Sequence, residues 1–305
     1  MTESAKLAEA LELQLRSGID EHIGQIRKAE NMLYHYTGLH SLMGMLETNN
    51  LWMSKGNFLN DSSELVYFSA VLEGVIEKMK DRKESGPGEF FSQQLAASME
   101  YFLQEVDENG FEVYIFSLSN TQDSLALWYN YAGGDGYNLG FSAKTLLDKV
   151  SGLQGGADML HGLVEYDRKR QEVILWDLLM DAFKLTAGYK KEDVKKVLPD
   201  HFFSIITICA IFFKDPTFQS EEEYRIALLN RNKNSWTAVK FRARNGVIIP
   251  YIAVDFEEKL PLGHITIGPK NNIDIAQKGM EHYVRSKGYD LEQITISKSV
   301  ATLRY

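Results

Sequence analysis

Apolar residues recur at helical spacing along the first thirty residues of the chain. They stand three or four positions apart with charged residues between them: Leu7, Leu11, Leu15, Ile19, Ile23 and Ile26. This spacing predicts an amphipathic helix over residues 5–30 that is interrupted near Gly18. The helix can cap the protein's own core, pair with another copy of the chain or lie on a membrane. Because acidic and basic residues mix on its polar face, we disfavour the membrane and favour the core.

A compact strand, helix and strand pattern follows at residues 33–54. Residues 33–37 are aromatic and β-prone, apolar positions at helical spacing occupy residues 39–46, and residues 51–54 form the second strand after an Asn-Asn turn. Side chains alternate along a strand, so His35 is expected to point to the face opposite Tyr34 and Tyr36.

The remaining pattern mixes helices with strands and shows no repeat and no convincing linker. We expect strands at residues 113–119, 137–142, 163–167, 221–229, 239–242, 247–254 and 265–268. We expect helices at residues 64–79, 90–107, 121–132, 171–189, 197–213 and 275–287. This order predicts an α+β fold, with an N-terminal helical extension at residues 1–30 and a single α+β domain at residues 31–305.

Composition narrows the function classes. The 305 residues are 44% hydrophobic and 25% charged, as in an ordinary globular protein. The net charge of -9 argues against a nucleic-acid-binding protein that works by neutralising many phosphates. The single cysteine, Cys209, lies in an apolar run and is expected to be a buried thiol. Glu3 and Glu9 stand where a secretory signal carries positive charge, and no apolar stretch reaches 18 residues, so we expect a cytoplasmic protein without a membrane partner.

Several familiar catalytic motifs are absent from the sequence. There is no Walker loop, no Gly-x-Ser-x-Gly elbow, and no His-Glu-x-x-His or Cys-His cluster, so no metal is predicted. The glycines at 133–136 follow a helix and precede a strand, which is the reverse of a dinucleotide-binding fingerprint.

Two carboxylates and a group of aromatic residues are candidates for chemistry. Glu221 and Glu223 alternate in a segment expected to be extended, so their side chains should share a face with Arg225. They form either a site with an unusual protonation state or a structural Glu-Arg network. The aromatic residues are either core or a stacking surface for a ligand: Trp128, Tyr129 and Tyr131.

Polar residues at the start of the helix expected at 64–79 form a further candidate group. Asn60 or Asp61 can cap this helix, whose first turn contains Glu64. Helix capping and a functional role remain equally open for these residues.

Taken in order, the motifs of this chain resemble the bacterial domain of unknown function family 2971. The resemblance extends from about residue 33 to the closing segment at 297–304. It is carried by Leu33-Tyr34-His35-Tyr36-Thr37, Leu51-Trp52, Asn60-Asp61 with Glu64, Phe116-Ser117-Leu118-Ser119, Leu127 to Ala132, Phe213-Lys214-Asp215-Pro216 with Phe218, Glu221-x-Glu223-Tyr224-Arg225, and Ile267-Gly268-Pro269-Lys270.

The opening strand and helix are also similar to the start of ADP-ribosyltransferases, including the DNA-modifying toxin type. This resemblance implies an ADP-ribosyltransferase-like split β-sheet core with helical insertions. It implies that His35 and Thr37 help to hold NAD, that one of the aromatic residues at 128–131 stacks on nicotinamide, and that Glu223, preceded by Glu221, steadies the ribosyl cation. Tyr34, Asn60, Asp61, Glu64 and Arg225 are further candidate site residues.

Three functions follow from these observations. The leading one is an NAD-consuming enzyme, a stress, toxin or phage-defence effector that transfers ADP-ribose to a protein or nucleic-acid acceptor or hydrolyses NAD. The second is a non-catalytic sensor or interaction module in which the same motifs hold the fold together. The third is a metal-dependent nuclease, which needs Asp61, Glu64, Glu221 and Glu223 to converge.

Overall fold

The computed structural model describes most of the chain. The described residues are 1–23, 32–58, 64–81, 88–108, 113–133, 135–152, 158–229, 239–244, 246–271 and 273–302. Contacts between residues group the chain into two compact units: unit 1 comprises Met1–Gln25, Gly56–Glu112 and Gly162–Gln219, and unit 2 comprises Ile26–Lys55, Val113–His161 and Ser220–Tyr305. The division into an extension at 1–30 and a domain at 31–305 stays a prediction.

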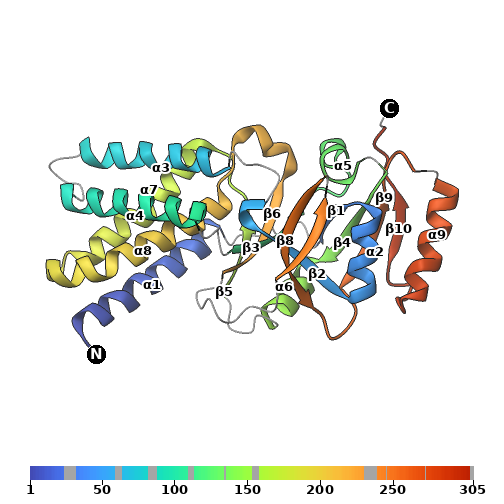
Figure 1. Cartoon of the computed structure of the whole chain (residues 1–305), viewed down its shortest axis with the longest axis horizontal. Helices are drawn as coiled ribbons and strands as arrows, with labels where there is room; N and C mark the ends of the chain where they lie inside the picture. The colour runs from blue at the N-terminus through green and yellow to red at the C-terminus, as the bar shows by residue number, and fades with distance from the viewer. Residues whose placement is uncertain are drawn as a thin grey trace. The chain divides into compact units, whose positions relative to one another are not determined.

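Unit 1 is built mainly from helices (Figure 1). These are α1 (Glu3–His22), α3 (Glu64–Asp81), α4 (Gly88–Glu108), α7 (Arg168–Thr186) and α8 (Lys191–Phe212), together with most of the 3-10 helix η2 (Pro216–Glu221) and the short η1 (Gly56–Phe58). Helix α1 packs against α7 and α8 and buries its apolar face there: Leu7, Leu11 and Leu15. The N-terminal helix therefore docks on the protein's own core, as its pattern predicts.

The predicted break at Gly18 is wrong, because α1 continues through this residue to His22. A Cβ atom at Gly18 would lie 2.5 Å from Cδ2 of Leu178 on α7. Gly18 thus allows close packing of two helices instead of ending one. The predicted buried thiol is confirmed: Cys209 on α8 is fully buried, and burial raises its pKa.

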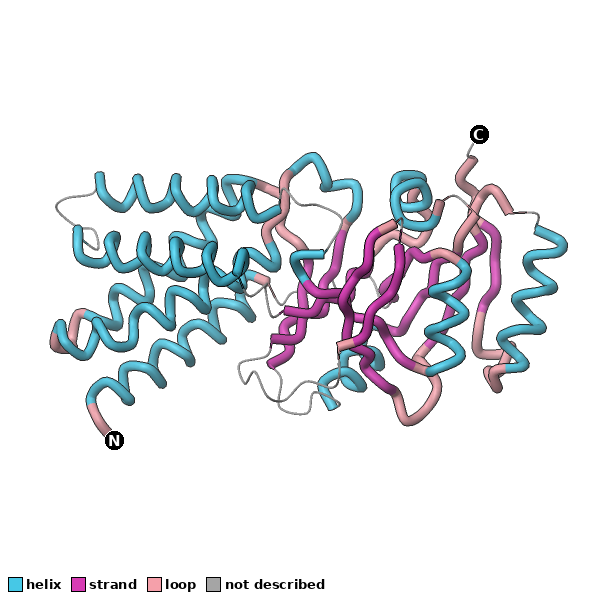
Figure 2. The backbone as a smooth tube through the Cα atoms, in the orientation of Figure 1, coloured by secondary structure: helices cyan, strands magenta, loops and turns pink. Residues whose placement is uncertain are grey.

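Unit 2 contains the β-sheet and four flanking helices (Figure 2). The strands are β1 (Met32–Thr37), β2 (Asn50–Lys55), β3 (Val113–Ser119), β4 (Tyr137–Ser142), β5 (Asp158–Leu163), β6 (Glu223–Leu229), β7 (Lys240–Arg244), β8 (Val247–Asp255), β9 (Leu262–Ile267) and β10 (Thr295–Lys298). The helices are α2 (Leu39–Thr48), α5 (Leu125–Ala132), α6 (Ala143–Gly152) and α9 (Ile273–Ser286). The predicted α+β class is confirmed, and the sheet is open and mixed.

The strand order within the described residues is β10-β9-β4-β1-β3-β2-β8-β7, with β6 paired to β3 and β5 paired to β6. Only the β9–β10 pair is parallel among the pairs whose register is defined; the antiparallel pairs are β4–β9, β1–β4, β1–β3, β3–β6, β2–β3, β2–β8 and β7–β8.

The sheet forks at β3. Strand β6 pairs with the whole of β3, from Val113 to Ser119. Strand β3 pairs with two further strands at its opposite ends: Ser119 pairs with Tyr34 of β1, whereas Tyr114 and Ile115 pair with β2. A strand has two edges, so β1 and β2 share the edge of β3 that β6 does not use. They diverge from each other beside the middle of β3.

One face of the strands around this fork is apolar. It includes Leu33, Phe116, Leu139, Phe141 and Ile226, all of which are buried. The opposite face carries polar side chains from the same strands, because side chains alternate along each strand. The candidate residues Tyr34, Glu223 and Arg225 belong to this polar face, together with Ser119.

Candidate functional site

The two glutamates lie where η2 ends and β6 begins. Glu221 is the last residue of η2, Glu223 is the first of β6, and both are buried, with exposed fractions of 4% and 6%. Glu222 between them has a φ of 42°, in the left-handed region. The predicted extended conformation is therefore wrong for Glu221, since a left-handed residue breaks the alternation on which it depended.

Arg225 shares the face of Glu223, as predicted. Its Nε and Nη2 donate to the two carboxylate oxygens of Glu223 over 2.8 and 2.9 Å. Only 1% of Arg225 is exposed. A two-point bond between planar groups fixes both side chains, and the pairing keeps two opposite charges together in a site with little water.

Helix α5 brings one aromatic residue to the glutamates. The Tyr131 hydroxyl donates to Oε1 of Glu221 over 2.6 Å. Helix α5 starts at a serine N-cap, Ser124, and ends at Gly133, whose φ of 64° suits glycine. These two caps set the length of the helix and hence the position of Tyr131 in its last turn.

The other two aromatic candidates lie elsewhere on α5. Trp128 is fully buried, its Nε1 donates to Oδ1 of Asp123 over 2.6 Å, and its ring packs edge-to-face on Tyr36. Tyr129 is 72% exposed. Of the three residues, Tyr131 is the one that contacts a glutamate of the predicted site, while Trp128 belongs to the core beneath α5.

The segment after β3 is tied to the glutamate segment by backbone contacts. The Ser119 hydroxyl donates to the carbonyl oxygen of Glu221 over 2.8 Å, and the Asn120 amide donates to that of Glu222 over 3.1 Å. Ser119 Oγ also accepts from the amide of Thr121. The polar end of β3 therefore holds the left-handed turn at Glu222 in place.

His35 lies at the fork of the sheet. Its Nδ1 donates to the carbonyl oxygen of Ser117 over 2.9 Å, and its ring stacks on Phe116 with centroids 4.5 Å apart. A carbonyl oxygen only accepts, so this bond places the proton on Nδ1. His35 points away from Tyr34 and Tyr36, as predicted.

Strand pairing separates His35 from Glu223. Glu223 pairs with Ser119 and Ser119 pairs with Tyr34, so these three residues share a face and His35, next to Tyr34, points to the other. Thr37 is buried at the end of β1, opposite Tyr137. The structure thus places Glu223 and Arg225 on one face, with Tyr131 bonded to the adjacent Glu221, and places His35 on the opposite face, with β3 between its strand and β6.

Sequence reasoning missed a histidine on the glutamate face. Direct cross-strand pairs run from Glu223 through Ser119, Tyr34 and Gly140 to His264 on β9. Four strand spacings of about 4.8 Å separate the ends of this row by about 19 Å. The alternation of polar and apolar residues at 264–267 was the available signal, since it places His264 on a polar face.

The remaining sequence candidates belong to the segment at the start of α3. Asn60 and Asp61 lie outside the described residues. Glu64 belongs to unit 1, where Oε1 lies 3.2 Å from Nζ of Lys214, and that ammonium group is 4.8 Å from the ring centroid of Phe218. Glu64 and Lys214, which come from two different motifs of the sequence resemblance, therefore form an ion pair.

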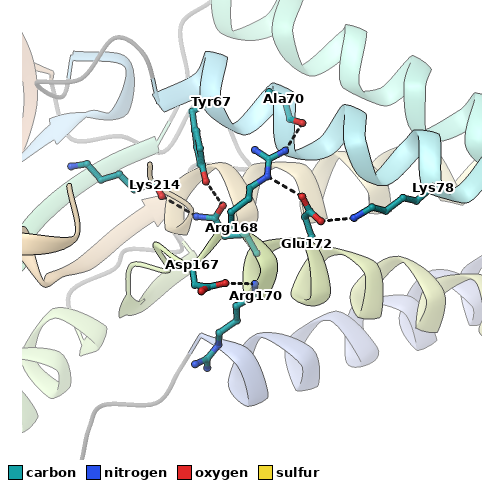
Figure 3. Close-up of polar contacts among 9 residues, drawn as sticks. Tyr67, Ala70, Lys78, Asp167, Arg168, Arg170, Glu172 and Lys214 are labelled. Carbon is teal, nitrogen blue, oxygen red and sulfur yellow. Dashed lines mark hydrogen bonds and ion pairs between the residues drawn. The ribbon is translucent and has the colours of Figure 1, made fainter. Parts of the chain in front are cut away.

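A hydrogen-bond network in unit 1 joins Tyr67 of α3 and Gln171 of α7 to the backbone of Lys214 (Figure 3). Gln171 is buried and donates to the carbonyl oxygens of Lys214 and Glu165, while it accepts from the Tyr67 hydroxyl over 2.7 Å. The Arg168 guanidinium lies over the Tyr67 ring. Every polar atom of the Gln171 amide is bonded, so this network joins α3, α7 and the end of α8 as a structural tie.

The nuclease hypothesis stays a prediction, because Asp61 lies outside the described residues. Across the described ranges, no three or more His, Cys, Asp or Glu side chains form a group that could hold a metal ion. In the same part of the chain, no helix is long and apolar enough to cross a membrane.

Residues 127–226 match the model of a family described as "Protein of unknown function (DUF2971)". The resemblance to the domain of unknown function family is thus confirmed over residues 127–226, which include the glutamate segment. No curated protein matches the chain, and no solved structure matches it.

Proposed function

We propose that this protein is an ADP-ribosyltransferase-like enzyme that consumes NAD, with its reacting centre at Glu221 and Glu223. The observation that carries the proposal is a pair of buried glutamates two residues apart, Glu221 and Glu223, the first of which accepts from the hydroxyl of Tyr131 on another element over 2.6 Å. Buried carboxylates held by hydrogen bonds are expected where positive charge develops in a reaction.

The forked sheet supports the same proposal. A core in which β1 and β2 part from a common edge of β3 agrees with the split sheet that an ADP-ribosyltransferase-like fold implies. His35 stands on one arm of the fork, and the glutamates follow on β6 at the other edge of β3. A dinucleotide that contacts the carboxylates would lie on the face opposite His35, which would support it only from behind, through its bond to β3.

The residues have distinct roles in the proposed reaction. The bond between nicotinamide and C1′ of ribose breaks, nicotinamide leaves with the electron pair, and C1′ gains positive charge. Glu223 stabilises this charge more in the transition state than in the ground state, while Arg225 fixes its orientation. An acceptor hydroxyl or amine, or water, then bonds to C1′ and loses a proton. Tyr131 orients Glu221 and presents its ring to the leaving group.

The proposal extends to biological context. The enzyme would work in the cytoplasm as a stress, toxin or phage-defence effector, with NAD as substrate and a protein or nucleic acid as acceptor. Pairing of two copies through α1 stays a prediction.

The test is release of nicotinamide from NAD by the purified full chain, measured by chromatography with and without candidate acceptors. We expect Glu223→Gln to lower the rate at least 100-fold, since one lost electrostatic contact to a developing charge has about that effect. Glu222→Gln is the matched control because Glu222 is adjacent and exposed. Nicotinamide release that survives Glu223→Gln would refute the assignment of this residue.

A non-catalytic interaction module is the second candidate. The buried two-point bond between Glu223 and Arg225 favours it, because a pair of this kind can have a purely structural role in holding β6 in place. On this hypothesis Glu223→Gln lowers stability, and neither the wild type nor the Glu222→Gln control releases nicotinamide at millimolar NAD.

A further inference from the structure

Gln122 places a primary carboxamide among polar side chains on the glutamate face. Its Nε2 lies 2.8 Å from Nε2 of His264 and donates to Thr266 Oγ1 over 3.4 Å. Its Oε1 accepts from the Tyr34 hydroxyl over 3.5 Å. Three side chains from β1 and β9 thus contact both ends of one amide group.

The surrounding groups match the two ends of a carboxamide. Tyr34 supplies a hydroxyl donor for the carbonyl oxygen, and His264 with Thr266 supplies acceptors for the amino group. Burial lowers the pKa of His264, which favours the neutral ring and keeps Nε2 available as an acceptor. A carboxylate in the same place would have no proton to offer to His264 or Thr266.

The Gln122 side chain is held weakly enough to be displaced. Two of its three contacts are long, at 3.4 and 3.5 Å, where hydrogen bonds contribute little. His264 Nε2 also lies 2.9 Å from the Ser297 hydroxyl, so departure of Gln122 does not leave the imidazole unsatisfied. Gln122 and His264 are both partly exposed, which gives a ligand a route to the cluster.

We propose that Tyr34, His264 and Thr266 form a binding site for a ligand that carries a primary carboxamide, and that the Gln122 side chain occupies this site as an internal competitor. The site shares a face with Glu223 through the row of cross-strand pairs. The site goes beyond the proposed function, because four strand spacings, about 19 Å, separate His264 from Glu223 along this row, which is farther than one nicotinamide group extends. Nicotinamide serves as a probe that carries such a carboxamide. Binding of the free carboxamide needs no catalysis, so the two proposals can fail separately.

The experiment measures binding of nicotinamide to the full chain by isothermal titration or ligand-observed NMR. Gln122→Ala removes the competing side chain. We expect this substitution to lower the Kd of nicotinamide about fivefold, because the ligand no longer has to break a hydrogen bond of ordinary strength made by Gln122. Gln93→Ala is the matched control, since Gln93 is an exposed glutamine on α4. In the Gln122→Ala background, His264→Ala and Thr266→Val should each weaken binding again.

Nicotinic acid tests the chemical class. It has the same ring and size but carries a carboxylate, and we expect it to bind the Gln122→Ala variant at least tenfold more weakly than nicotinamide. Equal binding of the two compounds, binding unchanged by Gln122→Ala, or binding that survives His264→Ala would each overturn the proposal. Nicotinamide binding without NAD cleavage would support this site while it refutes the enzymatic function.

Discussion

Acid should destabilise this protein through one buried histidine. His201 on α8 is 7% exposed, and within the described residues its Nε2 has no hydrogen-bond partner. Burial lowers its pKa to about 4 from the ordinary value of 6.5. The folded chain therefore binds this proton less readily than the unfolded chain does, so protonation favours unfolding.

The magnitude follows from the two pKa values. A difference of 2.5 units corresponds to about 3 kcal/mol of unfolding free energy, all of which is retained above pH 6.5 and lost as the pH falls to 4. About 2 kcal/mol of this loss falls between pH 7 and pH 5, a range in which most carboxylates stay ionised.

The assay is urea denaturation at pH 7 and pH 5, followed by circular dichroism. Between pH 7 and pH 5 the unfolding free energy of the wild type should fall by about 2 kcal/mol more than that of His201→Leu, because leucine cannot bind a proton. His40→Leu, at an exposed position on α2, is the control and should keep the wild-type dependence. If His201→Leu and the wild type lose stability in parallel, the histidine is not the acid-sensitive group.

Three further predictions test other contacts. Arg225→Met should lower the unfolding free energy by about 3–5 kcal/mol, because Glu223 loses its buried partner. The measurement is urea denaturation, and a loss below about 1 kcal/mol would contradict a buried pair. Gly136→Ala should lower the melting temperature, since its Cβ would meet the Thr37 carbonyl oxygen at 2.4 Å, and an unchanged melting temperature would refute the close approach. Asp123→Asn should cost about 1–3 kcal/mol because three donors face this carboxylate, and an isoenergetic variant in the same assay would exclude that role.

The elements predicted from the hydrophobic pattern are largely those observed. Strands expected at 113–119 and 137–142 match β3 and β4, because both are short apolar runs between turn residues. The expected turn before β2 is confirmed by Asn49, whose φ of 48° is left-handed. Local signals of this kind depend on a few neighbouring residues.

Elements decided by distant partners were predicted less well. The strand expected at 163–167 lies earlier, at β5, because Asp167 instead caps α7 by accepting from the Arg170 amide. The helix expected at 197–213 begins at Lys191 and includes Pro199. Strand β10 was not predicted, since its four residues pair only with β9.

The candidate site was predicted in part. The shared face of Glu223 and Arg225 followed from alternation within one strand, but the partner of Glu221 depended on α5, 90 residues away. No local pattern distinguishes Tyr131 from Trp128 and Tyr129, because their environments differ only after α5 packs on β1. The position of His264 likewise required the register of four strand pairs.

The fork at β3 also constrains how the chain can fold during synthesis. Asn50 of β2 pairs with Asp255 of β8, 205 residues later, and β3 pairs with β6 only after the helices of unit 1 have been made. Contacts so far apart in sequence form slowly, because a long loop must close before they contribute. A nascent chain that ends before Val247 therefore has a β2 edge without its second partner, and such edges bind other unfinished chains. Chaperone dependence during translation should accordingly end when β8 leaves the ribosome.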